Sequence, residues 1–135
     1  LILSHNTDRQ HKWGLRYLEL AKTIAGWSKD PSSQIGAIAV GSKGQVLAQG
    51  YNGFPRGMMD SQHLYINKTE KYARIIHAEM NMIFNASFNG VCFNGSRVYV
   101  SRFYPCFDCA KGHPAMGNYH HHQNPSAFNN IIISR

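Results

Sequence analysis

The chain has 135 residues, of which 43% are apolar and 16% are charged, a balance typical of one soluble globular domain. It carries 14 Lys and Arg residues against 7 Asp and Glu, and the resulting charge of +7 favours phosphate-bearing partners, either nucleotides or nucleic acid. No run approaches the ~18 consecutive apolar residues that a membrane span needs, and the first residues are not expected to form a signal peptide. We therefore expect a single domain over residues 1–135, located in the cytoplasm.

The first half of the chain predicts a helix followed by a β-hairpin. Apolar residues recur at spacings of three and four over 9–27, which is the period of an amphipathic helix. Two short runs rich in β-branched residues follow at 35–40 and 45–51, and residues 41–44 between them have the composition of a turn.

The second half predicts a loop, a helix and a further strand. Residues 52–68 contain Gly and Pro with little periodicity, which is typical of a long functional loop. Helical spacing returns over 72–88, and residues 96–101 alternate like a strand. Beyond the last cysteine only 126–135 regains helical or strand character. This order of elements predicts a mixed α/β sheet covered by helices.

Two short runs carry residues suited to chemistry, His77-Ala78-Glu79 and Pro105-Cys106-Phe107-Asp108-Cys109. This pairing is the known signature of zinc deaminases. One His and two Cys are three ligands, and a catalytic zinc keeps its fourth position for water. Glu79 lies two residues from His77, so we expect it to stay outside the inner shell and to carry protons for the zinc-activated water.

Other interpretations of these residues remain open. A lone His-x-Glu is usually a feature of a surface helix, and a lone Cys-x-x-Cys is also found in redox pairs and in structural zinc sites. The combination of both runs, in this order, favours a catalytic zinc. Cys92 has no partner at ligand spacing, so it is expected to be a small buried residue. The remaining histidines are expected to be exposed, and a second metal site is the alternative.

With these residues identified, the chain resembles the deoxycytidylate (dCMP) deaminases of the cytidine deaminase-like superfamily. The resemblance spans residues 13–111, and its most particular part is the run Tyr-Asn-Gly-Phe-Pro-Arg-Gly at 51–57. It implies a three-layer α/β/α sandwich with a mixed central sheet, and hydrolysis of dCMP to dUMP and ammonia for dTTP synthesis. The resemblance extends to viral and phage enzymes of this type. For a viral protein, the expected location is the cytoplasm of the host cell.

The resemblance also implies roles for individual residues around the substrate. His77, Cys106 and Cys109 would bind zinc, and Glu79 would be the proton shuttle. Further residues would contact dCMP: Asn52 the deoxyribose and base, the Ala78 backbone the pyrimidine edge, and Tyr119 the phosphate, if Tyr119-His120 matches the family's Tyr-His after the fourth strand. Lys29 and Arg74 are additional phosphate candidates because of their charge.

Regulation and assembly are implied in the same way. Gly53, Phe54 and Arg56 would belong to an allosteric dCTP loop, with Mg²⁺ accompanying the triphosphate. The family pattern adds dCTP as activator, dTTP as inhibitor and a homo-oligomer, usually a hexamer. The residue types agree in part with these implied roles, because Arg56 offers the forked donor that suits phosphate and glycine lets the backbone approach a ligand closely.

The chain departs from the family pattern after Lys111. Gly112, His113 and Pro114 follow at once, which leaves no room for the helix and strand that family members have there. We therefore expect a segment to be absent from this sequence between Lys111 and Pro114, with a true deletion as the alternative. Residues 128–135 resemble the opening of the family's last helix.

Three other functions are compatible with parts of the sequence. A nucleic-acid editing deaminase, acting on tRNA or single-stranded DNA, would fit the charge, but it needs a continuous basic channel and the cationic residues are scattered. A deaminase of free cytidine or deoxycytidine would share the zinc site. A structural or regulatory zinc module would have no use for Glu79 beside the metal.

Overall fold

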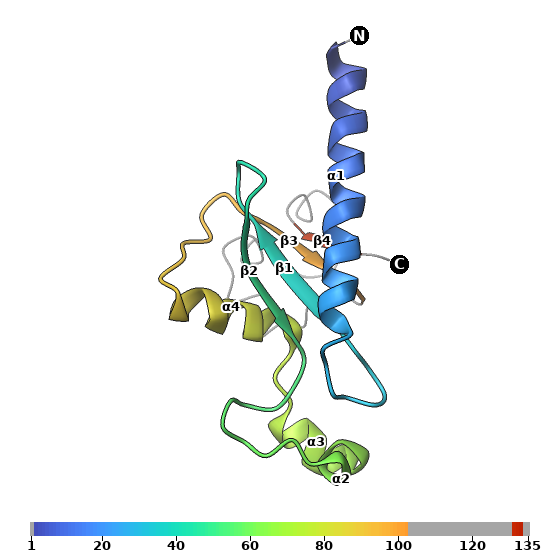
Figure 1. Cartoon of the computed structure of the whole chain (residues 1–135), viewed down its shortest axis with the longest axis vertical. Helices are drawn as coiled ribbons and strands as arrows, with labels where there is room; N and C mark the ends of the chain where they lie inside the picture. Colours follow the sequence, from blue (N-terminus) through green and yellow to red (C-terminus); the bar gives the residue numbers. More distant parts are fainter. Residues whose placement is uncertain (1, 103–130, 134–135) are drawn as a thin grey trace, which may run out of the picture.

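The computed structural model describes residues 2–102 and 131–133. Figure 1 shows one long helix beside a small sheet, a second helix on the other side of that sheet, and two short helices beyond one end of it. The elements are α1 (Ile2–Ala25), β1 (Gly36–Val40), β2 (Val46–Tyr51), α2 (Gln62–Ile66), α3 (Lys68–Arg74), α4 (Ala78–Phe88), β3 (Arg97–Val100) and β4 (Ile131–Ile133).

The strands that the structure describes form one sheet in the order β2-β1-β3-β4. β1 lies antiparallel to both of its neighbours, so Ile38 is opposite Gln49 of β2 and opposite Tyr99 of β3. β4 runs parallel to β3, with Ile132 opposite Tyr99. The sheet is therefore mixed, which confirms the prediction.

Helices cover both faces of the sheet. Successive side chains of a strand point to opposite faces. On one face Ile38 of β1 packs with Ile24 of α1. On the other face Ala37 and Ala39 of β1 pack with Met82 of α4. The sheet lies between α1 and α4, as Figure 1 shows, and the predicted three-layer α/β/α architecture is confirmed.

α1 is longer than the sequence predicted. The apolar spacing indicated a helix over 9–27, whereas α1 has 24 residues and begins at Ile2. In Figure 1 the first turns of α1 project beyond the sheet. A helix needs an apolar stripe only where it packs against other elements. The apolar spacing in the sequence therefore indicated only the part of α1 that packs against the sheet. Within the part of the chain that is described, no helix is long and apolar enough to cross a membrane.

The predicted helix over 72–88 is in fact two helices. α3 ends at Arg74 and α4 begins at Ala78. Between them Ile76 forms an isolated bridge with Gly53, in which the Ile76 amide donates to the Gly53 carbonyl at 2.8 Å and the Gly53 amide donates in return at 3.1 Å. This contact between distant segments removes Ile76 from the helix, so a new helix starts directly after His77.

The segment 52–68, predicted to be an irregular loop, contains α2. Its one buried side chain, Tyr65, stacks on Phe54 with ring centroids 4.1 Å apart. The aromatic pair anchors the Gly- and Pro-rich stretch to α2, so the segment has a small core of its own.

β4 corrects the expectation for the end of the chain. The family pattern implied the opening of a helix at 128–135, but Ile131–Ile133 is a strand beside β3. Three consecutive isoleucines favour a strand because they are β-branched. Tyr119 lies outside the described residues, so its expected role stays a prediction. The expected missing segment near Lys111 lies outside the described residues.

Cys92 also differs from the expectation. It was predicted to be buried, but it is exposed, in the turn between α4 and β3. Its sulfur lies 3.5 Å from the amide of Asn94, the next residue but one. An Asn-Gly turn on either side keeps this stretch at the surface.

Two glycines allow the helices to approach the sheet closely. A Cβ atom at Gly50 of β2 would lie 2.2 Å from the Met82 amide nitrogen and 2.6 Å from the Ala78 carbonyl oxygen, both in α4. A Cβ atom at Gly36 of β1 would lie 2.1 Å from the Ala21 carbonyl oxygen of α1. The start of α4 is therefore set by backbone contact with β2.

We expect Gly50→Ala to destabilise the protein by about 2 kcal/mol or more, because the added methyl meets backbone atoms that cannot rotate away. Urea denaturation measures the change. Gly14→Ala is the matched control, since nothing lies within 4 Å of its added Cβ on α1. In a helix interior this control is expected to stabilise by about 0.5–1 kcal/mol. Equal stabilities of the two variants would contradict the close approach.

Candidate active site

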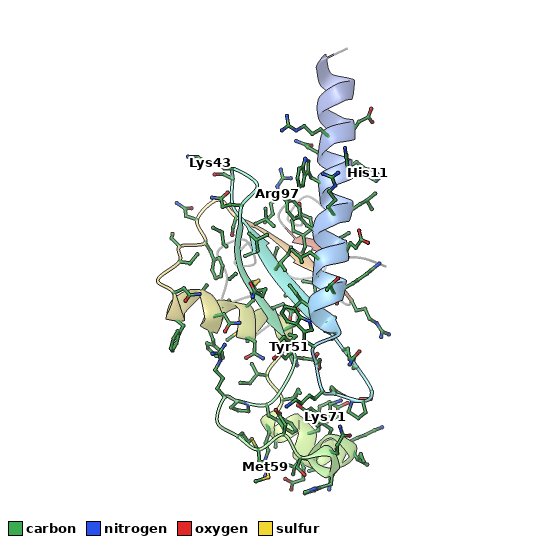
Figure 2. All side chains as sticks on the ribbon, in the orientation of Figure 1. His11, Lys43, Tyr51, Met59, Lys71 and Arg97 are labelled. Carbon is green, nitrogen blue, oxygen red and sulfur yellow. The ribbon has the colours of Figure 1, made fainter. Side chains whose placement is uncertain are left out.

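A cleft of about 280 Å³ opens at the end of the sheet where β1 begins and β2 and β3 end. The same end holds the start of α4, and Figure 2 shows Lys71 on this side of the molecule. Backbone elements from four parts of the chain therefore converge here. The polar residues that line the cleft are chiefly Asp30, Asn52, Lys71, His77, Glu79 and Arg102.

His77 and Glu79 reach the cleft from the first residues of α4. His77 is the N-cap residue, with extended backbone angles, and its side chain is exposed. Glu79 lies in the first helical turn and is only 5% exposed. The dipole and the unpaired amides of a helix start favour a carboxylate at this position. The structure thus brings a metal-ligand candidate and an acid–base candidate onto one wall.

A buried ion pair supports the opposite wall. Lys71 of α3 lies 2.6 Å from Asp30, and their side chains are 9% and 1% exposed. Lys71 also donates to the Ser32 hydroxyl at 2.8 Å. Asp30 accepts in addition from the Ser32 amide at 2.9 Å and the Ser32 hydroxyl at 3.0 Å. These bonds hold the loop before β1 against α3.

The net effect of this environment is to lower the pKa of Asp30. Burial alone would raise the pKa, since it penalises the charged form. Burial is outweighed by the hydrogen bond from Lys71, the hydrogen bonds from Ser32 and the attraction of the Lys71 charge taken together. Asp30 is therefore a carboxylate throughout the physiological range, and it serves as a structural anion.

Asn52 is held by the same loop. Its side-chain oxygen accepts from the Ile35 amide at 2.8 Å. Its side-chain nitrogen donates to the Ser33 carbonyl at 2.7 Å and to Asp30 at 3.3 Å. Both amide protons are used within the protein. Asn52 is therefore able to accept a hydrogen bond from a ligand with the second lone pair of its side-chain oxygen.

Two predicted phosphate contacts, Lys29 and Arg74, are not among the residues that line the cleft. Lys29 forms an exposed ion pair with Asp60 at 2.8 Å, and the hydrogen bond to Asp60 and its charge raise the pKa of Lys29. Ala78, between His77 and Glu79, has its side chain in the core, and the contact expected of its backbone stays a prediction. Arg74 pairs with Glu70 one helical turn away. The charge of Lys29 and Arg74 is thus already matched by carboxylates.

The three residues of the expected allosteric loop do not share one surface. Gly53 is tied to Ile76, and Phe54 is buried against Tyr65. Arg56 is exposed, and its guanidinium donates to the Asn85 side chain of α4 beside a hollow of about 270 Å³. Of the three, Arg56 is the side chain available to an outside ligand.

The donor set fits zinc. Cys106, Cys109 and Tyr119 lie outside the described residues, and within 2–102 and 131–133 no three His, Cys, Asp or Glu side chains gather to hold a metal. His77 presents one exposed imidazole at the cleft wall. An imidazole completed by two thiolates from a Cys-x-x-Cys run is a known zinc set, and Glu79 beside it remains outside that set.

Sequence reasoning missed two residues of the cleft. Lys71 and Arg102 were counted only among scattered surface charges, but both line the cleft. Lys71 reaches it because α3 folds back onto the loop before β1, and Arg102 because β3 ends there. Neither residue belongs to a local motif, so no signal in the sequence identified them.

The fold and the cleft together define a class of protein. A mixed sheet between two helical layers, with a His-x-Glu run opening the helix at the cleft, is the arrangement of the cytidine deaminase-like proteins. A family model described as the cytidine and deoxycytidylate deaminase zinc-binding region matches residues 11–117. The chain belongs to this family of cytidine and deoxycytidylate deaminases.

Individual relatives agree with this membership. A deoxycytidylate deaminase of Pongo abelii is 39% identical over 109 residues, covering 77% of this chain and 60% of that protein. The dCMP deaminase of cyanophage S-TIM5 in apo form is 27% identical with a TM-score of 0.60, covering 73% of this chain and 71% of that one. Its complex with dCMP and dUMP matches with a TM-score of 0.59 at 27% identity, covering 71% and 68%. The chain spans about 60% of the length of the curated relatives it matches.

Proposed function

We propose that this chain hydrolyses dCMP to dUMP and ammonia in a zinc-dependent reaction. The observation that carries the proposal is the placement of His77 and Glu79 on one cleft wall at the start of α4. Support for the substrate comes from the phage relative, which binds dCMP and dUMP. A free nucleoside is the main alternative substrate, because it would use the same two residues.

His77, together with Cys106 and Cys109, would hold the zinc ion. Zinc bound there would supply Lewis-acid activation of a water molecule near neutral pH. The remaining chemistry belongs to side chains of this protein. In the overall reaction a carbon–oxygen bond forms at the amino-bearing carbon of the cytosine ring, the carbon–nitrogen bond breaks, and the amino group leaves as ammonia.

Glu79 moves the protons in this scheme. Its carboxylate takes a proton from the attacking water and delivers it to the ring nitrogen. It then takes the remaining proton from the newly attached hydroxyl group, which becomes the carbonyl of dUMP, and gives it to the departing amine. Burial suits this work, because a carboxylate shielded from bulk water exchanges its proton with the bound substrate rather than with solvent. Asn52 would accept a hydrogen bond from a sugar hydroxyl with the lone pair that the protein leaves unused.

Arg102 would bind the substrate phosphate. It is an exposed cationic residue of the cleft lining and lies two residues after the end of β3. We expect Arg102→Gln to raise the KM for dCMP by about 10- to 100-fold, the worth of a charged hydrogen bond, and to leave deoxycytidine turnover within about twofold. Steady-state kinetics on both substrates measure this. Arg74→Gln, whose arginine pairs with Glu70, is the matched control and should leave both KM values unchanged. Equal losses on dCMP and deoxycytidine would contradict the assignment.

An ammonia-release assay tests the proposed function as a whole. Zinc-loaded protein is offered dCMP, deoxycytidine and a single-stranded DNA oligonucleotide in parallel. Preferred turnover of dCMP supports the proposal. Equal turnover of deoxycytidine would identify a nucleoside deaminase, and release of ammonia from the oligonucleotide alone would identify an editing enzyme.

Regulation by dCTP and dTTP, and a hexameric assembly, stay predictions of the family pattern. Arg56 beside Asn85 is the part of the expected regulatory loop that is exposed. Repeating the dCMP assay with dCTP or dTTP added, and measuring the mass of the protein in solution, tests both.

A further inference from the structure

Two asparagines of α4 bind the backbone of β2 through their side chains. The Asn81 side-chain nitrogen donates to the Tyr51 carbonyl at 2.8 Å, and the Asn85 side-chain nitrogen donates to the Gln49 carbonyl at 2.6 Å. β2 is the first strand in the order of the described sheet, so it lies at the edge of that sheet. An edge strand leaves carbonyls without a partner strand, and α4 satisfies two of them here.

The spacing of the two donors matches the spacing of the two acceptors. Side chains four residues apart lie on the same face of a helix, with Cβ atoms about 5–6 Å apart. Carbonyls two residues apart along a strand are separated by roughly 6.6 Å. A slip of α4 by one residue would turn each asparagine by about 100° around the helix axis and break both bonds. The pair of bonds is therefore compatible with one rotation of α4 against β2.

Asn85 is held from two sides. Its side-chain oxygen accepts from the Arg56 guanidinium, while its side-chain nitrogen donates to Gln49. An amide serves both contacts because it carries a donor and an acceptor. Asn81 and Asn85 are both half-buried, so water has limited access to replace these bonds.

The two bonds lie on either side of the close contact at Gly50. A Cβ atom at Gly50 would lie 2.2 Å from the Met82 amide nitrogen, so the backbones of β2 and α4 already touch at this point. One point of contact sets the separation of a helix and a strand, but it permits the helix to roll. The bonds from Asn81 and Asn85 to the residues before and after Gly50 remove that freedom.

The bond from Asn81 also connects two residues of the active-site cleft. Asn81 follows Glu79 by two residues, and Tyr51 directly precedes Asn52. Glu79 and Asn52 line the cleft from the start of α4 and from the end of β2. A roll of α4 would therefore displace the Glu79 carboxylate relative to the Asn52 side chain.

We propose that Asn81 and Asn85 are positioning residues, which hold α4 in the rotation that directs Glu79 at a substrate bound by Asn52. Neither asparagine is among the described residues that line the cleft, so both act through Glu79 rather than by touching substrate. The effect on Glu79 rests on the proposed function, whereas the attachment of α4 to β2 does not. Hydrogen exchange tests the attachment, and kinetics test its effect.

Hydrogen exchange of side-chain amides is measured without substrate. In nitrogen–proton NMR spectra the amides of Asn81 and Asn85 should exchange about tenfold more slowly than that of Asn89, an exposed residue at the end of α4. Each signal is assigned by its loss in the corresponding leucine variant. In Asn81→Leu the Asn85 amide should also exchange faster, because the two bonds hold the same helix in place.

Asn81→Leu is expected to lower kcat for dCMP by about 10- to 100-fold, since a misplacement of about 1 Å has an effect of this order. Leucine has nearly the size of asparagine but no donor. Asn81→Gln retains a donor and should keep more of the activity. Asn89→Leu, the matched control on the same helix, should leave kcat within about twofold. Thermal unfolding sets an assay temperature at which every variant is folded.

Combination with Glu79→Gln distinguishes a positioning role from a merely structural one. If Asn81 acts through Glu79, adding Asn81→Leu to Glu79→Gln should lower kcat by less than about twofold further, because residues that act as one unit are not additive. A general effect on the fold would lower kcat by the same factor in both backgrounds.

Three outcomes would overturn the proposal. These are equal exchange rates for the three asparagine amides, a folded Asn81→Leu enzyme with unchanged kcat, and equal losses from Asn81→Leu with and without Glu79. A parent protein that releases no ammonia from dCMP would refute the proposed function and with it the role of Glu79. Hydrogen exchange would still decide whether the asparagines hold α4, so the two proposals fail separately.

Discussion

Glu79→Gln is expected to lower kcat for dCMP by about 10³-fold, while the KM changes little. The amide keeps the size and the hydrogen-bonding capacity of the side chain, but it cannot take a proton from water or deliver one to the leaving amine. General acid–base catalysis contributes about 10²–10⁴-fold in enzymes, and Glu79 would serve every proton transfer in the cycle. Ammonia release under saturating dCMP measures the loss.

The control for this experiment is Glu70→Gln. Glu70 is a half-exposed carboxylate of α3 that pairs with Arg74, and it does not line the cleft. Its loss should leave kcat within about twofold, as surface ion pairs contribute little. Zinc content and thermal unfolding of Glu79→Gln should match the parent protein. An active Glu79→Gln enzyme with normal zinc content would rule out the proposed proton shuttle.

Lys71→Met is expected to lower the free energy of unfolding by about 3–5 kcal/mol, because it leaves the Asp30 carboxylate buried without its cation. Urea denaturation at neutral pH measures the change. Lys68→Met, on the same helix but exposed, should cost less than about 0.5 kcal/mol. The double variant Asp30→Asn, Lys71→Met should recover part of the loss, since it removes the unpaired charge.

The ion pair between Asp30 and Lys71 also predicts that the free energy of unfolding depends on pH. The pKa of Asp30 is lowered from its ordinary value of 3.8, so the folded state binds a proton less readily than the unfolded chain. The stability contributed by this group is therefore fully present above pH 3.8 and is lost as the pH falls through the lower folded value. In Lys71→Met the loss should begin at higher pH. Parent and variant curves that run parallel in acid would contradict the pairing.

The sequence predicted the elements that depend on local pattern. The hairpin, the strand before the cysteines and the packed part of α1 follow from apolar spacing and turn residues, which act over a few positions. It also identified the His-x-Glu run, and the structure places both residues on one cleft. Each of these features depends on residues that lie close together in the sequence.

Contacts between distant segments were not predictable in the same way. The break between α3 and α4 comes from the bridge between Ile76 and Gly53, and helical spacing alone gave no sign of it. Lys71 became part of the cleft through Asp30 of another segment. Lys29 was expected at the substrate, but Asp60 from the loop holds it at the surface instead. In each case the partner is far away along the chain.

By itself, then, the sequence determined which reactive residue types are present and in what order: a histidine, a glutamate and two cysteines in the pattern of the known zinc deaminase signature. The tertiary structure alone decided the burial and the hydrogen-bond partners of the residues around the cleft. In the folded protein both side-chain amide protons of Asn52 are bonded to the loop before β1. Asp30 is buried against Lys71, and the backbone of α4 lies in contact with Gly50. The reason is physical, because residue type specifies what a side chain is able to do, whereas burial and partners, which come from packing, decide what remains available to a substrate.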